Sequence, residues 1–153
     1  WVVGTGPEQA ALQSLASEIG AEVKFYGFKT GDELWSLVKQ ARAVVLPSEW
    51  YENAPISILE AYALGKPVIG ARIGGIPEMI REGETGRLFA SGSVDELTAV
   101  LADMAAMPDS TVEQWAHEAR SWVSEEYSPE QHYARLSALY AMYGAQTVSP
   151  RRE

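Results

Sequence analysis

Short apolar runs alternate with amphipathic stretches along most of the chain. The runs are rich in Val, Phe, Tyr and Leu, which is typical of β-strands, and they occupy residues 1–3, 22–27, 41–48, 66–72 and 86–89. Between them, apolar residues recur three or four positions apart, which is the helical period. This alternation predicts an α/β fold with a doubly wound parallel sheet that helices cover on both faces.

The first predicted helix carries its apolar residues on one side. Leu12, Leu15, Ala16 and Ile19 recur at helical spacing, and Gly20 closes the segment, because glycine readily adopts the left-handed conformation of a helix end. We expect this helix to cover the sheet.

Further helix starts are marked by capping boxes, in which Ser or Thr is followed three residues later by Glu or Gln. The pairs are Thr30 with Glu33, Ser93 with Glu96, Ser110 with Glu113, and Ser128 with Gln131. The first pair predicts a short helix that carries Leu34, Leu37 and Val38, and the other three predict a helical final third. The last helix of that third carries an apolar stripe of Leu136, Leu139, Tyr140 and Tyr143. A polar tail is predicted for residues 145–153, so the domain is assigned to residues 1–144.

The segment "YENAPISILEA", residues 51–61, places two glutamates around an apolar stretch. A helix is expected from about Pro55 to Leu64, because Pro suits the first helical position and Gly65 suits the exit. The segment follows the apolar strand at residues 41–48. Ligands of doubly wound sheets bind beyond the carboxyl ends of the strands, so this segment is a candidate binding site.

Two polar residues, Ser57 and Glu60, interrupt the apolar helix and share one face because they are three positions apart. Asn53 and Glu52 precede that face at the helix entrance. An isolated buried carboxylate is costly, and a ligand rich in hydroxyl groups would supply the missing donors. The free N–H groups of the helix start attract anions, so the combination suggests a nucleotide-sugar. Alternatively, Glu60 bonds a neighbouring backbone group or Arg and Glu52 lies on a solvated loop; the spacing leaves both interpretations open.

The charge narrows the list of partners. A formal net charge of −9 argues against nucleic acid or an anionic membrane as the main partner, since both favour a basic surface. The chain has no cysteine, no signal peptide and no apolar run long enough to span a membrane, which fits a cytoplasmic protein. It begins at Trp1 with an apolar run, so we expect it to be a piece of a longer protein.

Other motifs point less clearly to chemistry. Residues 4–9, "GTGPEQ", begin like a dinucleotide fingerprint but have Gln9 where the third glycine belongs, which argues against a dehydrogenase. His117 and His132 are interpreted as surface residues, because they have no partner at metal-ligand spacing. The stretch "RIGGIPE", residues 72–78, is either a phosphate-cradling loop or a tight turn before a short helix, and the turn is favoured.

The stretch "ENAPISILEA" resembles the E-x7-E motif of the family 4 retaining glycosyltransferases, whose fold is called GT-B. The stretches "VVGTGPE", "VKFYGF", "AVVLPS" and "EAYALGKPVIGARIGGIPEMIREGETGRLF" follow in that family's order. The resemblance covers roughly residues 1–143, and the run from Pro47 to Phe89 is its specific part.

This resemblance implies roles for particular residues. Glu52 is assigned the catalytic position, where it would bond hydroxyls of the donor sugar, and Glu60 would bond the ribose. The other implied donor-binding residues are Asn53, Ala54, Ile56, Ser57, Gly27, Phe28, Pro47 and Ser48. The family often has Gly-Phe-Gly where this chain has Asn53-Ala54-Pro55, and Pro55 has no N–H to donate.

The resemblance also implies what lies outside this chain. The fold would be the Rossmann-like C-terminal half of a GT-B enzyme without its first strand–helix unit, which carries an Arg and a Lys for the diphosphate. Within the chain, Arg72 stands at the carboxyl end of its strand and could help, whereas Lys66 stands at the amino end. The parent would add an N-terminal acceptor domain, which could place it peripherally at the inner membrane face.

The implied activity is transfer of a hexose-type sugar from a nucleotide diphosphate sugar to an acceptor hydroxyl, without a metal or other cofactor. The fragment alone is expected to be inactive, because the diphosphate-binding cations and the acceptor domain are absent from it. Two alternatives stay open: a non-catalytic nucleotide-sugar binding module, and another GT-B enzyme such as a nucleotide-sugar epimerase.

Overall fold

The computed structural model describes the backbone of residues 1–144 and the side chains of residues 1–143. The predicted polar tail lies outside these residues. The chain divides into two compact units, Trp1–Ala41 and Arg42–Glu153, and each is described by itself.

The first unit contains helices α1 (Gln9–Glu18) and α2 (Gly31–Gln40). The strands predicted at residues 1–3 and 22–27 are wrong as continuous strands, because they meet in a single parallel bridge between Val2 and Phe25. Two backbone hydrogen bonds frame this bridge, from Val2 N–H to the Lys24 carbonyl (2.8 Å) and from Tyr26 N–H to the Val2 carbonyl (2.9 Å).

The apolar stripe of α1 is exposed within the first unit. Leu12, Leu15 and Ile19 keep 47%, 50% and 66% of their accessible surface. The helix itself is confirmed, but none of its residues, nor any residue of α2, is buried. A unit this small has too few elements to cover two amphipathic helices.

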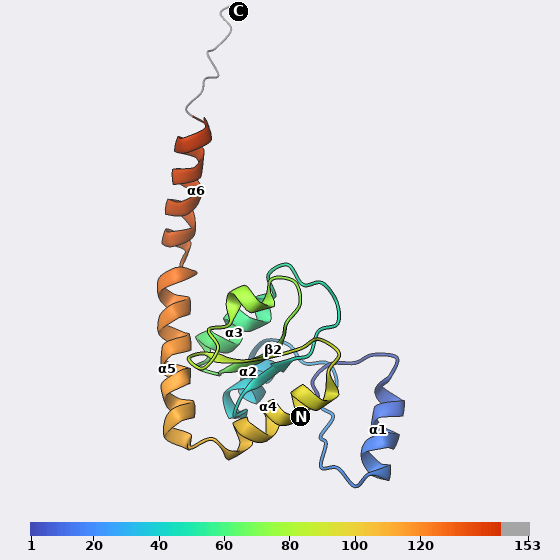
Figure 1. Cartoon of the computed structure of the whole chain (residues 1–153). Helices are drawn as coiled ribbons and strands as arrows, with labels where there is room; N and C mark the ends of the chain where they lie inside the picture. The colour runs from blue at the N-terminus through green and yellow to red at the C-terminus, as the bar shows by residue number, and fades with distance from the viewer. Residues whose placement is uncertain (145–153) are drawn as a thin grey trace, which may run out of the picture. The chain divides into compact units, whose positions relative to one another are not determined.

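The second unit is built on a parallel sheet. Its strands are β1 (Val44–Leu46), β2 (Val68–Ala71) and β3 (Gly86–Phe89), in the order β1-β2-β3. The central strand β2 is labelled in Figure 1. The remaining elements are α3 (Ile56–Ala63), the 3₁₀ helix η1 (Ile76–Met79), α4 (Val94–Ala106), α5 (Asp109–Glu126) and α6 (Pro129–Gly144). The predicted α/β fold with a parallel sheet is confirmed.

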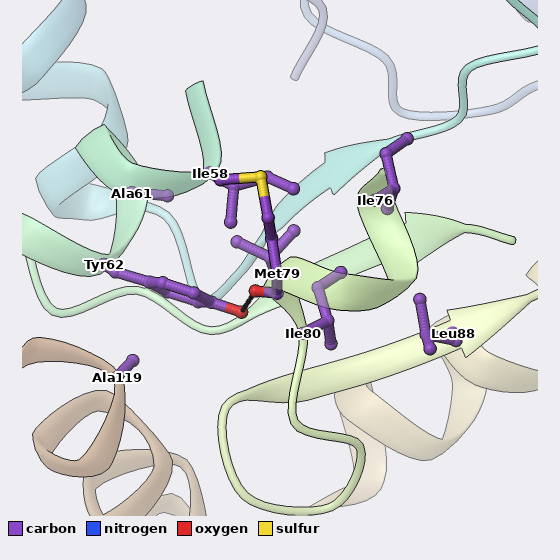
Figure 2. Close-up of a cluster of buried hydrophobic side chains, with 9 residues drawn as sticks. Ile58, Ala61, Tyr62, Ile76, Met79, Ile80, Leu88 and Ala119 are labelled. Carbon is purple, nitrogen blue, oxygen red and sulfur yellow. Dashed lines mark hydrogen bonds between the residues drawn. The ribbon is translucent and has the colours of Figure 1, made fainter. Parts of the chain in front are cut away.

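Strand β2 is the centre of two cores, because all four of its residues are buried and alternate between the faces. On one face, Val68 belongs to a cluster with residues of α3, η1 and α5. Figure 2 shows members of this cluster, among them Ile58, Ile76 and Ala119. On the other face, Ile69 and Ala71 pack with Met104 of α4 and Trp115 of α5. Helix α5 contributes to both cores, so the sheet is covered on each side.

Two of the predicted capping boxes are confirmed as N-caps. The Glu96 N–H donates to Ser93 Oγ and the Gln131 N–H donates to Ser128 Oγ, each at 3.2 Å. The Glu96 carboxylate does not complete the capping box by bonding the Ser93 N–H. It accepts a hydrogen bond from the Ala90 N–H at 2.7 Å.

The other two boxes are wrong. Thr30 precedes α2 but makes no side-chain cap bond, and Glu33 pairs instead with Lys29 at 3.4 Å. Ser110 lies inside α5, because that helix begins at Asp109, directly after Pro108. A proline before a helix sets the start of the helix by its fixed backbone angle, and here this outweighs the capping pattern.

The apolar stripe of α6 is present but exposed. Leu136, Leu139, Tyr140 and Tyr143 keep 38%, 54%, 67% and 76% of their surface. Among the described residues, the helix therefore has an apolar face without a covering element.

Tyr62 of α3 anchors the core against the segment after η1. Its side chain is fully buried, and its hydroxyl donates to the Met79 carbonyl at 3.0 Å (Figure 2). The Thr85 hydroxyl lies 2.9 Å from the Tyr62 hydroxyl oxygen and forms a second hydrogen bond with it. Burial raises the pKa of Tyr62 far above its ordinary value, and the bond to Thr85 opposes this only in part.

Tyr62→Phe should lower the free energy of unfolding by about 1–3 kcal/mol, because it leaves buried polar partners without the phenol. Above pH about 10, a tyrosine of the unfolded chain ionises while buried Tyr62 keeps its proton, so this residue makes stability fall as pH rises. The variant should consequently lose less stability between neutral and alkaline pH. Urea unfolding at both pH values measures this, with the exposed Tyr140→Phe as control; equal alkaline losses in Tyr62→Phe and the unaltered chain would contradict the expectation.

Candidate functional site

Three loops leave the carboxyl ends of the parallel strands at one edge of the sheet. The β1 and β3 exits are joined by a hydrogen bond from Ser91 Oγ to the Ser48 carbonyl at 2.9 Å. The β2 exit is joined to the β1 exit by a bond from the Gly75 N–H to the Glu52 carbonyl at 2.8 Å. The exit loops therefore form one bonded surface, and it includes the loop predicted as the site.

Glu52 lies half-buried in the β1 exit loop. Its carboxylate faces Ser48, whose hydroxyl donates to Oε1 at 3.4 Å. This is long for a hydroxyl donor, so the bond is weak and the carboxylate keeps the capacity to accept from a ligand. The structure thus brings together Ser48 and Glu52, two of the residues that the sequence singles out.

Helix α3 begins directly after this loop. It begins at Ile56, one residue later than predicted, so Pro55 is its N-cap and not its first helical residue, and no side chain caps the helix. The Ile58 N–H bonds back to the Pro55 carbonyl at 3.1 Å, whereas the preceding N–H groups of Ile56 and Ser57 belong to the first turn, which has no intrahelical acceptors. Both residues are exposed, so this helix start faces solvent.

The expectation that Glu60 lies in a buried segment is wrong. Ile58, Ala61 and Tyr62 are buried against the sheet, but Ser57 and Glu60 are exposed. A helix that lies on one face of a sheet buries only the stripe that touches it. The predicted polar stripe therefore exists as an open face, and the cost of burying an unpaired carboxylate does not apply to Glu60.

The remaining predicted residues fall in both units. Asn53, Ala54 and Pro47 are exposed in the same β1 exit loop as Glu52. Gly27 and Phe28 belong to the first unit, where Gly27 turns the chain with φ 65° and Phe28 is 74% exposed.

Sequence reasoning missed two parts of this surface. Ser91 gave no signal, because an isolated serine after a strand is common. The glycine pair Gly74-Gly75 was visible, but it was assigned only to a turn. The short helix η1 at Ile76–Met79 confirms that turn, and the contact with Glu52 adds a close approach of two backbones, which glycines after a strand often indicate.

Arg72 stands at the end of β2, as predicted. Its guanidinium pairs with the Glu82 carboxylate at 2.7 Å, and both side chains are substantially exposed. Because its charge is already paired with a carboxylate, Arg72 is less available to bind the anionic group of a ligand.

The described residues contain neither a metal-ligand cluster nor a helix suited to crossing a membrane. No group of three or more His, Asp or Glu side chains is arranged to hold a metal ion. No helix in residues 1–144 combines the length and apolarity needed to cross a bilayer.

The family of the chain follows from comparison with known proteins. The model of the group 1 glycosyl transferases matches residues 1–122. The chain belongs to this family, and the resemblance seen in its sequence is confirmed.

Curated relatives are considerably longer than this chain. The N-acetyl-alpha-D-glucosaminyl L-malate synthase of Bacillus anthracis is 31% identical over 143 residues, which are 91% of this chain and 36% of the relative. The GDP-mannose-dependent alpha-(1-6)-phosphatidylinositol monomannoside mannosyltransferase of Mycolicibacterium smegmatis is 30% identical over 146 residues, 90% of this chain and 38% of the relative. The chain thus spans little more than a third of these proteins.

Solved structures show the same partial coverage. Sucrose-phosphate synthase of Thermosynechococcus elongatus matches with a TM-score of 0.76 and 24% identity, over 95% of this chain and 38% of that one. Anabaena HepE, solved in complex with UDP-glucose, also has a TM-score of 0.76 and 24% identity, over 92% and 40%. These likenesses show the fold, which is that of part of a GT-B glycosyltransferase.

Proposed function

We propose that this glycosyltransferase domain is the donor-binding part of a retaining enzyme. The complete protein would transfer a hexose-type sugar from a nucleotide diphosphate sugar to an acceptor hydroxyl. One observation carries the proposal: half-buried Glu52 and the open start of α3 lie at the carboxyl edge of the sheet, and Glu60 is exposed on α3 one turn after that start. This is the edge at which doubly wound folds bind ligands.

A nucleotide diphosphate sugar has a ribose, a diphosphate and a transferred sugar, and each would find suitable hydrogen-bonding groups at this site. Glu60 would accept hydrogen bonds from the ribose hydroxyls, since an ionised carboxylate is purely an acceptor. The first-turn N–H groups at Ile56 and Ser57 would face the diphosphate, because a helix start offers donors and a partial positive charge. Glu52 would bond hydroxyls of the transferred sugar, and its weak bond to Ser48 leaves room for this.

Adjacent residues would complete the donor site. Asn53 and Ala54 are exposed beside Glu52, and the Asn53 amide could replace the donor that Pro55 lacks. The base would contact Pro47 and Ser48 of this loop. Gly27 and Phe28, which belong to the first unit, stay predicted donor-binding residues.

The known proteins support a nucleotide-sugar without selecting one. HepE was solved with UDP-glucose, and the Mycolicibacterium relative is described as GDP-mannose-dependent. UDP-glucose and GDP-mannose are ligands of those two proteins. Because the two ligands differ in both base and sugar, membership of the family does not specify either for this chain. Thermal shift against UDP-, GDP- and ADP-sugars is the first experiment.

We further propose that the reaction needs no metal or other cofactor. The leaving diphosphate would be stabilised by helix-start N–H groups and basic side chains, which act on the charge as it develops. Arg72 is held by Glu82, so the main cations would come from the complete protein outside these residues. That protein would also supply the N-terminal acceptor domain and would act in the cytoplasm, with that domain as its contact to the inner membrane face.

Glu60→Ala, made in the complete protein, should weaken donor binding about ten- to a hundredfold, because hydrogen bonds to a charged acceptor contribute about 1.5–3 kcal/mol. The free energy of unfolding should change by less than about 0.5 kcal/mol, because the residue is exposed. Calorimetric titration with the donor found by the screen measures the affinity. Glu113→Ala removes an exposed carboxylate from α5 and serves as control; unchanged donor affinity in folded Glu60→Ala would remove this residue from the site.

Residues 1–153 alone should transfer no sugar and should bind donor weakly. A nucleotide diphosphate brings at least two negative charges to a chain with net charge −9, and a helix start offsets only about half a charge. No acceptor hydroxyl would be positioned for attack. A transfer and donor-hydrolysis assay compares the fragment with the complete protein, with and without acceptor. Fragment turnover within about tenfold of the complete protein would show that the catalytic groups are misplaced, and acceptor-independent epimerisation by the complete protein would favour an epimerase.

A further inference from the structure

The β2 exit loop contacts the backbone of the Glu52 loop through Gly74 and Gly75. The Gly75 N–H donates to the Glu52 carbonyl at 2.8 Å. A Cβ atom added to Gly74 would lie 2.1 Å from the Glu52 carbonyl oxygen, and one added to Gly75 would lie 1.9 Å from the Asn53 carbonyl oxygen. Both contacts are with backbone, which cannot swing aside as the end of a flexible side chain could.

The two glycines are required for different reasons. Gly74 has φ +56°, a left-handed conformation that by itself favours glycine in a turn. Gly75 has φ −84° and ψ −2°, which any residue adopts. The turn therefore does not explain Gly75, whereas the neighbouring Asn53 backbone does.

The support beneath the Glu52 loop is anchored in the core. Gly75 is the N-cap of η1, whose Ile76 is fully buried and whose Met79 is buried at 5% exposure. Figure 2 shows Ile76 and Met79 among the buried side chains of this cluster. The β2 exit is also held to the β3 exit by a bond from the Arg72 N–H to the Phe89 carbonyl at 2.7 Å. The Glu52 loop thus contacts a segment whose buried side chains, Ile76 and Met79, anchor it in the core.

We propose that Gly74 and Gly75 are positioning residues, whose bare backbone carries the Glu52–Asn53 loop and fixes where the Glu52 carboxylate lies. This proposal deepens the donor-site assignment and rests on it for its catalytic consequence. A side chain at Gly75 would push the loop away by about 1 Å or more, and a displacement of that size can cost about a hundredfold in rate. The mechanical coupling of the two loops is independent of any ligand.

Gly75→Ala tests the coupling, and the chain offers two matched controls. Gly6 has no left-handed φ, and an added Cβ meets nothing within 4 Å, so Gly6→Ala should change neither the loop nor the rate. Gly86 lies inside the sheet, where an added Cβ would be 1.9 Å from the Val68 carbonyl oxygen. Gly86→Ala should therefore reduce stability by the same kind of clash without displacing Glu52.

The first readout is hydrogen exchange of the amide of residue 75 in the 153-residue chain, because this amide donates to the Glu52 carbonyl and the measurement needs no nucleotide-sugar. Relative to the intrinsic rate of each residue type, Gly75→Ala should accelerate exchange of this amide about tenfold or more, beyond any acceleration in Gly86→Ala. Equal exchange in the two variants would overturn the proposal, because Gly75 would then support only stability. If Gly75→Ala does not fold, the same exchange is measured in the unaltered chain. A Gly75 amide that exchanges at the rate of an unprotected peptide would show that its hydrogen bond to the Glu52 carbonyl is not formed, and the proposal would be overturned.

The second readout is sugar transfer by the complete protein, well below the unfolding temperature of each variant. Gly75→Ala should lower kcat about tenfold to a hundredfold, and Gly86→Ala should leave kcat of the folded fraction unchanged. An unchanged kcat in Gly75→Ala, together with faster exchange of the residue 75 amide, would show that Gly75 does not position Glu52 for catalysis. If the unaltered complete protein transfers no sugar while the amide exchange changes as expected, the donor-site assignment fails and the contact between the two loops stands.

Discussion

The burial of β2 on both faces is the constraint on which the second unit depends. All four residues of the strand are buried, and their side chains alternate between a core shared with α3 and η1 and a core shared with α4 and the start of α5. A parallel strand in the middle of a sheet needs crossovers on its faces, and each crossover returns the chain in the same direction. The exit loops of all three strands consequently meet at one edge, where Glu52 lies.

That edge is assembled mainly from backbone contacts. The Glu52 loop is held by the Gly75 amide on one side, and its Ser48 carbonyl accepts from Ser91 on the other. Both bonds engage the backbone of the Glu52 loop, so the Glu52 carboxylate accepts only the weak bond from Ser48, and Ser57 and Glu60 of α3 are exposed. A surface of this kind can be rigid while its carboxylates remain available to a ligand.

The electrostatics of the same edge are incomplete for a diphosphate. Carboxylates at Glu52 and Glu60 suit hydroxyl groups, whereas an anion needs donors and positive charge. The start of α3 provides donors, but Arg72 is paired with Glu82 and the net charge is −9. The exposed apolar stripes of α1 and α6 likewise lack covering elements among the described residues. Both features agree with a chain that spans little more than a third of its curated relatives.

The sequence by itself determined the order and type of the main elements, the parallel α/β class and the loop that carries Glu52, because these follow from local periodicity and from residue types at strand ends. Tertiary structure alone decided that Glu60 is exposed and that the strands at residues 1–3 and 22–27 reduce to one bridge. It also decided that Gly75 touches Asn53. Periodicity tells which residues share a face, whereas the covering of that face and the approach of two backbones depend on residues distant in the chain.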